Sequence, residues 1–182
     1  MGVLLRISNA IDRVTAFIGQ SVTWLILLSI LVSAGNATSR KLFSLSSNAW
    51  LELQWYLFAG AYLLAAAYTL QRNDHIRIDI ISGLLPKAVR NWIDVVGHTL
   101  MLLPFMILMI KEAMPWFLQS YRIGEMSSNY GGLIQWPAKG LILAGFFLLA
   151  IQAVSELIKR IAVMRGLIPD PYDTPDPTAP IE

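Results

Sequence analysis

The chain of 182 residues contains no cysteine and few charged residues. Without cysteine it cannot form disulfides, use a thiolate nucleophile or bind cysteine-ligated zinc or iron–sulfur clusters. Asp, Glu, Lys and Arg make up only 14% of the residues, against about 25% in soluble domains. Because 55% of the residues are hydrophobic and the mean hydropathy is +0.56, the composition predicts an integral membrane protein.

The basic residues also do not gather in one patch. They lie at the ends of apolar segments, and the net charge is only +2, so we expect no nucleic-acid partner. The N-terminal apolar run is too long for a secretory signal peptide, and no clean small-residue cleavage site follows it. We therefore expect this run to be a membrane helix of the protein.

Long charge-free stretches define four predicted transmembrane helices. No charge occurs between Arg13 and Arg40, or among the nineteen residues from Leu53 to Gln71, and about 20 residues of helix cross a hydrocarbon core. The sequence thus predicts an all-α fold with a single four-helix membrane domain at 1–165. Its helices are expected at about 14–34, 50–71, 90–111 and 137–163.

Two of these helices have flanking segments that are harder to assign. Residues 1–13 carry apolar residues at helical spacing. They are either a short interfacial amphipathic helix or the first turns of the first transmembrane helix. Pro104 is expected to kink the third helix, which membranes tolerate. The apolar pattern of that helix continues toward Tyr121, so a long helix would have to tilt or lie partly in the interface.

The remaining segments are predicted to be loops and a tail. Residues 36–48 form a polar stretch, and residues 122–135 are rich in Gly, Ser and Asn. Residues 166–182 are rich in Pro and Asp and cannot pack into a core, so they are predicted to be a disordered cytoplasmic tail. Lys159 and Arg160 are expected to reach the headgroups from the end of the last helix.

The distribution of Lys and Arg predicts the orientation in the membrane. Cytoplasmic segments carry an excess of these residues. The two termini and the connection between the second and third helices hold nine of the 14, and the other two connections hold five. Both termini are therefore predicted to be cytoplasmic, and the loops at 36–48 and 122–135 periplasmic. The nine are Arg6, Arg13, Arg72, Arg77, Lys87, Arg90, Lys159, Arg160 and Arg165.

The segment from Trp50 to Asp79 is the most distinctive part of the sequence. It leads from Trp50 and Glu52 through a small-residue apolar helix into the pattern R-x-D-H-x-R-x-D. A second series follows in the 3–4 loop and the last helix: Gly124-Glu125-Met126-Ser127-Ser128, Trp136-Pro137-x-Lys139, and Gly145. Over most of Trp50 to Gln152, this order and spacing resembles the small membrane subunit (DctQ-type) of tripartite ATP-independent periplasmic (TRAP) transporters.

The resemblance implies a non-catalytic subunit of the bacterial inner membrane, with no cofactor and no metal. It would form a stable heterodimer with a large membrane subunit, which carries an organic acid together with sodium. A periplasmic substrate-binding protein would dock on the pair transiently. The residues agree with a scaffold role, because a transport pathway needs polar groups near the bilayer midplane. Residues such as Ala65, Ile107 and Phe147 lie there instead.

Glu52 and the charged residues after the second helix are candidate structural or partner-contact sites. Glu52 is either a contact to a partner or coupling ion, or an interfacial acid that is solvated or paired with Arg40 or Lys41. The charged group alternates in sign, which favours headgroup contact. The resemblance adds the role of a cytoplasmic brace between the second and third helices. This group consists of Arg72, Asp74, His75, Arg77 and Asp79.

The two predicted periplasmic loops supply candidates for docking of the binding protein. Their positive charge balance suits an acidic patch on that partner. The other interpretation is that the basic side chains contact lipid headgroups. The candidates are Arg40, Lys41, Arg122, Glu125, Ser127 and Ser128.

The two histidines of the chain, His75 and His98, support an alternative from another class. Both would lie on the cytoplasmic side and could be axial ligands of a haem, as in a membrane anchor of a respiratory complex. A plain anchor without haem belongs to the same alternative. A loop as charged as that of His75 is poorly suited to enclose an apolar macrocycle, so the transporter subunit is the favoured interpretation.

Overall fold

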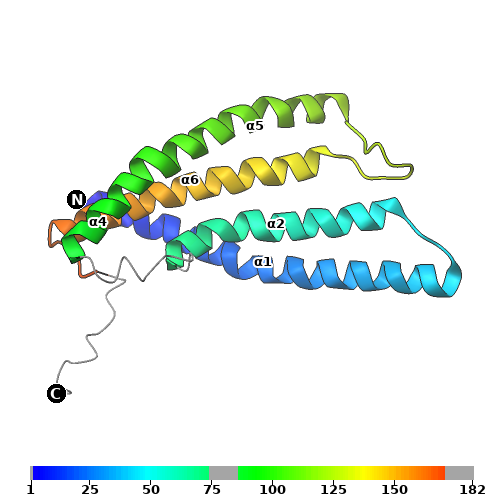
Figure 1. Ribbon diagram of the computed structural model, residues 1–182, viewed down its shortest axis with the longest axis horizontal. Coiled ribbons are helices and arrows are strands. Elements are labelled where there is room, and N and C mark those ends of the chain that lie inside the picture. Colours follow the sequence, from blue (N-terminus) through cyan, green and yellow to red (C-terminus); the bar gives the residue numbers. More distant parts are fainter. Residues whose placement is uncertain (1, 74–85, 171–182) are drawn as a thin grey trace, which may run out of the picture.

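The computed structural model describes residues 2–73 and 86–170, and the long elements in this part of the chain are all helices (Figure 1). The all-α prediction is therefore confirmed. The elements are α1 (Gly2–Phe43), α2 (Asn48–Arg72), α4 (Lys87–Val96), a π-helical segment (Gly97–Leu102), α5 (Leu103–Ile123) and α6 (Trp136–Met164).

Helix α1 is a single element of 42 residues. Residues 2–13 are its first turns rather than a separate interfacial helix. The predicted loop at 36–48 is wrong, because only residues 44–47 separate α1 from α2. The helix ends at Phe43, and the next residue, Ser44, has a φ of +55°, the left-handed conformation that commonly follows a helix. The polar residues before Ser44 do not end the helix, and Asn36 is buried within it.

The third predicted helix is also longer than expected. It begins as α4, passes through the π-helical segment and continues as α5 to Ile123. The π-helical segment ends two residues before Pro104, where the sequence predicts a kink. Proline has no N–H to donate and its ring crowds the preceding turn, and π-bulges are among the recognised ways in which a helix accommodates such an interruption. In this helix, the local distortion before Pro104 is the wider turn of the π-helical segment.

The helices lie roughly side by side in the order α5, α6, α2, α1 (Figure 1). Helix α6 packs against α1, α2 and α5. The N-terminus, the end of α2, α4 and the end of α6 meet at one end of the bundle, here called the terminal end. The 44–47 turn and the 124–135 loop lie at the opposite end, here called the loop end.

Many of the buried residues are small, and many large apolar side chains face outward. Ala61, Ala67 and Ala153 are at most 3% exposed, whereas Trp24 is 68% and Trp55 is 72% exposed. A Cβ added at Gly145 of α6 would lie 2.9 Å from Leu63 Cβ and 3.1 Å from the Leu63 carbonyl oxygen of α2. Small residues of this kind let membrane helices approach closely.

Three of the described helices are long and apolar enough to cross a membrane. They are Gly2–Phe43, the continuous helix Val89–Ile123, and Trp136–Met164. Helix α2 has a suitable length of 25 residues but is not one of the three. Its Gln, Trp and Tyr residues lower its hydropathy. The predicted count of four transmembrane helices therefore remains a prediction.

Several predicted features lie outside the described residues. They are Asp74, His75, Arg77 and Asp79 of the charged group, and residues 171–182 of the tail. The brace between the second and third helices and the disorder of the tail remain predictions.

Candidate functional site

At the loop end, Glu52 binds the connection between α5 and α6. It lies one turn after the start of α2. Its Oε1 accepts hydrogen bonds from the Ser127 hydroxyl and from the Asn129 side-chain amide, the latter at 2.9 Å. Its Oε2 accepts one from the Leu133 backbone N–H at 2.6 Å. We call these four residues the Glu52 cluster. Through it, a single side chain of α2 holds the 124–135 loop at three points.

The loop also has its own backbone structure. The Ser127 N–H donates to the Leu133 carbonyl at 2.9 Å, and the Gln135 N–H donates to the Glu125 carbonyl at 2.8 Å. Gly132 lies inside the resulting hairpin. A Cβ there would lie 2.5 Å from Ser127 Cβ and 2.7 Å from Glu52 Oε1. Glycine is thus required for Glu52 to approach the loop this closely.

Hydrogen bonding fixes the charge state of Glu52. The Ser127 hydroxyl, followed by the Leu133 and Asn129 amides, holds the pKa of the Glu52 carboxyl below its ordinary value of 4.5, although partial desolvation acts in the opposite direction. Glu52 is therefore a carboxylate at neutral pH, the form that accepts all three hydrogen bonds.

A second ion pair at the loop end joins Glu125 to Lys139. The Lys139 ammonium also lies 4.5 Å from the centre of the Trp116 ring, a cation–π contact, and Lys139 is only 6% exposed. The hydrogen bond from Lys139 lowers the pKa of the Glu125 carboxyl. The start of the loop is thereby attached to both α5 and α6.

These residues border a groove of about 570 Å³ between α2, α5, α6 and the loop. Its walls are mostly aromatic and aliphatic, with the Glu52 and Lys139 side chains among them. Trp55, Tyr56, Trp116 and Ile142 contribute the larger apolar surfaces.

At the terminal end, Asp12 of α1 binds three side chains of α6. Its Oδ1 accepts hydrogen bonds from the Gln152 amide and the Ser155 hydroxyl, each at 2.9 Å. Its Oδ2 lies 3.0 Å from Lys159 Nζ, which in turn lies 2.5 Å from Glu156 Oε1. We call these five residues the Asp12 cluster. Gln152 and Ser155 are fully buried, so the cluster joins the two helices in their interior.

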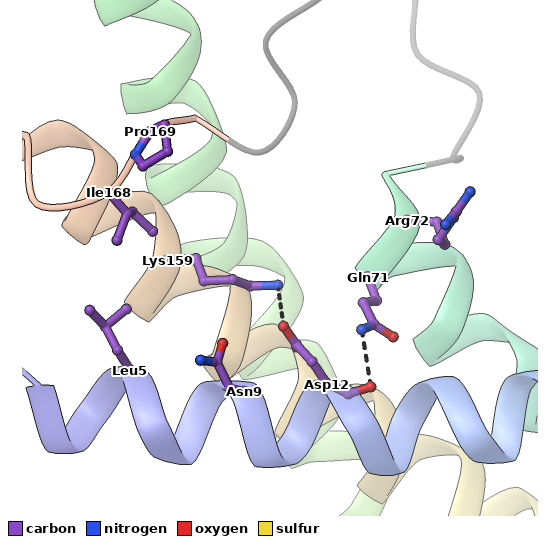
Figure 2. Close-up of a pocket in the computed structure, with 8 residues that line it drawn as sticks. All are labelled: Leu5, Asn9, Asp12, Gln71, Arg72, Lys159, Ile168 and Pro169. Atoms are coloured by element: carbon purple, nitrogen blue, oxygen red, sulfur yellow. Dashed lines mark hydrogen bonds and ion pairs between the residues drawn. The ribbon is translucent and has the colours of Figure 1, made fainter.

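An open cavity of about 680 Å³ lies beside the Asp12 cluster (Figure 2). Asp12 lies between Lys159 and Gln71, and the Gln71 amide donates to the Asp12 backbone carbonyl at 3.0 Å. The apolar wall opposite is formed by Leu5, Ile168 and Pro169. The cavity therefore has one charged and one apolar side.

Arg160 connects α6 to α4 and to the chain beyond α6. Its guanidinium lies 2.9 Å from Asp94 Oδ2 and 3.2 Å from Asn91 Oδ1. It lies 3.4 Å from Asp170 Oδ1. The expectation that Lys159 and Arg160 reach the headgroups is wrong, because their side chains are only 12% and 8% exposed. Both are paired with acids of neighbouring segments instead.

One comparison with known proteins identifies the family. The family model described as "Tripartite ATP-independent periplasmic transporters, DctQ component" matches residues 29–163, most of the chain. The chain belongs to this family. It is the small membrane subunit of a TRAP transporter and a multi-pass membrane protein. Transporters of this kind also have a large membrane component and a substrate-binding protein. No curated protein and no solved structure matches the chain.

The family assignment confirms the resemblance noted in the sequence and gives no support to the respiratory-anchor alternative. In the structure, His98 Nδ1 lies 2.6 Å from the Asp94 carbonyl oxygen, while His75 is outside the described residues. Within residues 2–73 and 86–170, no group of three or more His, Cys, Asp or Glu side chains could hold a metal ion.

The structure separates the residues that the sequence analysis grouped for docking. Within the subunit, Ser127 binds Glu52 and Glu125 binds Lys139. The other four candidates are exposed at the loop end: Arg40, Lys41, Arg122 and Ser128. Arg72 borders the cavity at the terminal end.

The Asp12 cluster and the pairing of Arg160 were not predicted from the sequence. Asp12 and Asp94 were not among the candidate residues. A usable signal was nevertheless present. Acids near the terminal ends of the first and third helices face two basic residues near the end of the last helix, and buried charges in membrane proteins are usually paired.

Proposed function

We propose that this TRAP subunit is a non-catalytic scaffold for the large membrane subunit of a sodium-coupled importer of an organic acid. It also helps to form the docking surface for the periplasmic binding protein. The observation that carries the scaffold role is the distribution of polar groups. The described charged clusters lie at the two ends of the bundle, and close helix contacts fill the middle.

The middle of the bundle is packed too tightly for a substrate pathway. Gly145 lies against the backbone of Leu63, and Gly60 lies against Leu141. Ala61, between these contacts on α2, and Ala67, one turn beyond them, are also buried. Because a transport pathway needs polar groups near the midplane, we infer that the substrate passes through the large subunit.

We further propose that α2 crosses the membrane together with the three more apolar helices. Ser29 of α1 donates to the Gln54 carbonyl of α2, and Gln71 of α2 donates to the Asp12 carbonyl of α1. The two helices therefore run antiparallel over at least 17 residues, about 26 Å of helix. A hydrocarbon core is about 30 Å thick, so α2 follows α1 through most of it.

The two ends of the bundle also suit the predicted orientation. The terminal end gathers both ends of the described chain and the segments richer in Lys and Arg. We propose that it faces the cytoplasm, that the loop end faces the periplasm, and that the membrane is the bacterial inner membrane. Periplasm-dependent reporters fused after Ser44 and after Arg165 test this orientation. Activity after Arg165 and not after Ser44 would refute it.

Exposed aromatic side chains form a candidate contact surface for the large subunit. Trp55, Phe58 and Tyr62 are 62–73% exposed, and their spacing places them on one face of α2. Lipid tails provide no hydrophobic drive for helices to associate, so shape complementarity must select this contact. The charged group containing Arg72 is proposed to brace the cytoplasmic connection between α2 and α4.

Co-expression and reconstitution test the proposed function. We expect the subunit to co-purify with the large subunit at a fixed stoichiometry. In proteoliposomes, the pair should take up an organic acid only with the binding protein and an inward sodium gradient. A subunit that is stable alone and transports solute without the large subunit would overturn the scaffold proposal.

A further inference from the structure

Tyr130 has the highest exposed fraction among the large hydrophobic side chains of the described residues, at 98%. It lies at the tip of the 124–135 loop. Tyrosine is one of the residue types enriched among those that carry most of the binding energy at protein interfaces.

The backbone around Tyr130 is fixed on both sides. The Asn48 side-chain amide donates to the Tyr130 carbonyl at 2.9 Å. The side-chain amide of the preceding residue, Asn129, donates to Glu52 Oε1 at 2.9 Å. The Asn129 backbone carbonyl accepts a hydrogen bond from the Gly132 N–H at 3.0 Å. The ring is thus presented to solvent on a backbone that is attached to α2. An anchor held in this way loses little conformational entropy when it binds.

The position of Asn48 places Tyr130 beyond the apolar part of α2. Asn48 is the first residue of α2 and lies four residues before Glu52, which is about 6 Å along the helix axis. The charge-free stretch begins only at Leu53. The neighbours of Tyr130 on the tip, Ser128 and Asn129, are exposed and polar. This is the environment of the aqueous side rather than of the acyl chains.

We propose that Tyr130 is an anchor residue for the periplasmic substrate-binding protein. Its ring enters an apolar pocket on that partner, and an acidic rim around the pocket pairs with Arg40, Lys41 and Arg122 at the same end of the bundle. Glu52 is a positioning residue that holds the tip in place. This inference rests on the proposed function, which supplies the periplasmic orientation of the loop end.

Sodium-driven uptake by the reconstituted pair, measured against binding-protein concentration, tests the anchor. Removing a central aromatic anchor typically costs about 2 kcal/mol of binding free energy or more. Tyr130→Ala should therefore raise the concentration needed for half-maximal uptake by about 30-fold and leave the maximal rate nearly unchanged. Tyr130→Phe keeps the ring and should stay close to wild type. An unchanged half-maximal concentration in Tyr130→Ala would overturn the inference.

A double-mutant comparison tests the positioning role of Glu52. Glu52→Gln should shift the half-maximal concentration in the same direction as Tyr130→Ala. In the Tyr130→Ala background it should add little, because the residue that it positions is already missing. Equal effects of Glu52→Gln in both backgrounds would show that Glu52 does not act through Tyr130.

Direct labelling distinguishes the binding protein from lipid. Because the chain has no cysteine, Ser128→Cys provides a unique attachment site for an environment-sensitive dye beside an intact Tyr130. The binding protein should change the dye fluorescence saturably, and brominated acyl chains should not quench it. Quenching by brominated lipid without a response to the binding protein would assign the tip to the membrane and overturn the inference.

These outcomes are separable from failure of the proposed function. If wild-type uptake depends on the binding protein while Tyr130→Ala behaves as wild type, the anchor is refuted and the scaffold function stands. If the reconstituted wild-type pair takes up no solute with any binding protein from its transporter, the proposed function fails and the anchor fails with it.

Discussion

The two ends of this bundle use the same chemistry for different purposes. At each end one carboxylate of a helix receives three donors from elsewhere in the chain. The partners of Glu52 all come from a single loop, whereas those of Asp12 come from α6. The Glu52 cluster therefore orders a connection, and the Asp12 cluster joins two helices.

Burial makes the two clusters unequal in energy. Gln152 and Ser155 are fully buried, and the Lys159 side chain is 12% exposed. If Asp12 is removed, water cannot easily reach the fully buried Gln152 and Ser155 to replace it as an acceptor, whereas Lys159 borders the open cavity. Ser128, Asn129 and Tyr130 are exposed beside Glu52, so water can hydrogen-bond the loop if Glu52 is lost. We expect defects at the terminal end to affect the whole bundle and defects at the loop end to remain local.

The largest effect is expected for Asp12→Ala. Among the described residues, the change leaves Lys159 with Glu156 as its acid partner. It also removes one acceptor each from the fully buried Gln152 and Ser155, which keep the Glu156 carboxylate and the Ser8 carbonyl, respectively. Breaking a buried ion pair by removing one partner costs about 3–5 kcal/mol. Because Lys159 keeps Glu156, we expect a loss of about 3 kcal/mol. Thermal unfolding of the purified complex in detergent measures it.

Asp12→Asn is the matched control for this prediction. It keeps one carbonyl acceptor for Gln152 or Ser155 and should lose clearly less stability than Asp12→Ala. Equal unfolding temperatures for wild type and Asp12→Ala would refute the view that this cluster joins α1 to α6.

Glu52→Ala should produce a large but local effect. Three donors of the loop lose their acceptor, and hydrogen bonds to charged groups are the stronger ones. We expect the Leu133 amide to exchange its hydrogen at least about tenfold faster, since the stabilisation lost corresponds to about one order of magnitude or more. The unfolding midpoint of the complex should change little. Glu112→Ala, which removes an exposed acid of α5, should change neither quantity. A large drop in the midpoint would show that the loop end also supports the bundle.

The Glu52 cluster should resist mild acid. The pKa of Glu52 is lowered in the folded protein, so the stabilisation is fully present above the ordinary value of 4.5 and is lost as the pH falls through the lower folded value. Protection of the Leu133 amide, corrected for intrinsic exchange, should be constant from neutral pH to about 4.5 and then decrease. Glu52→Gln should lack this acid transition. A loss of protection that begins near neutral pH would contradict the assignment.

Truncation after Pro169 should have the smallest effect. It removes Asp170, which lies 3.4 Å from Arg160, but Asp94 at 2.9 Å and Asn91 at 3.2 Å remain. Arg160 therefore keeps an acid partner, and we expect a stability loss of about 1 kcal/mol or less. Asp94→Ala, which removes the closer partner, should cost more. A failure of the truncated subunit to assemble with the large subunit would show that the chain beyond Pro169 is a necessary contact.

Much of the fold could be predicted from the sequence because membrane helices are set by hydropathy along the chain. Four apolar stretches were located, and the ends of α2 and α6 lie within two residues of the predicted ones. The errors occurred where polarity was taken as a loop signal. Asn36 and its neighbours are polar, yet the helix continues to Phe43. A helix can leave an apolar phase without ending, since its backbone hydrogen bonds are internal.

For the sites, the sequence located Glu52 and the loop residues but not the bonds between them. Ser127 and Glu125 were grouped as docking candidates with Arg122 because all three lie in one loop. Ser127 is bound inward because Gly132 allows Glu52 to approach it, and Glu125 is bound inward because it pairs with Lys139 of α6. The composition of the loop contains no information about how closely Glu52 of α2 approaches it.

The sequence by itself determined that this protein is helical, belongs in a membrane and has the order of motifs of a TRAP small subunit. These properties follow from local composition and spacing, which each segment carries independently of its neighbours. The tertiary structure decided which charges are paired, that the 124–135 loop is held by Glu52, and that Tyr130 is left exposed at the tip of this loop. Asp12 and Lys159 are 147 residues apart in the chain. Only the antiparallel packing of α1 and α6 brings two such charges to 3.0 Å, beside the fully buried Gln152 and Ser155.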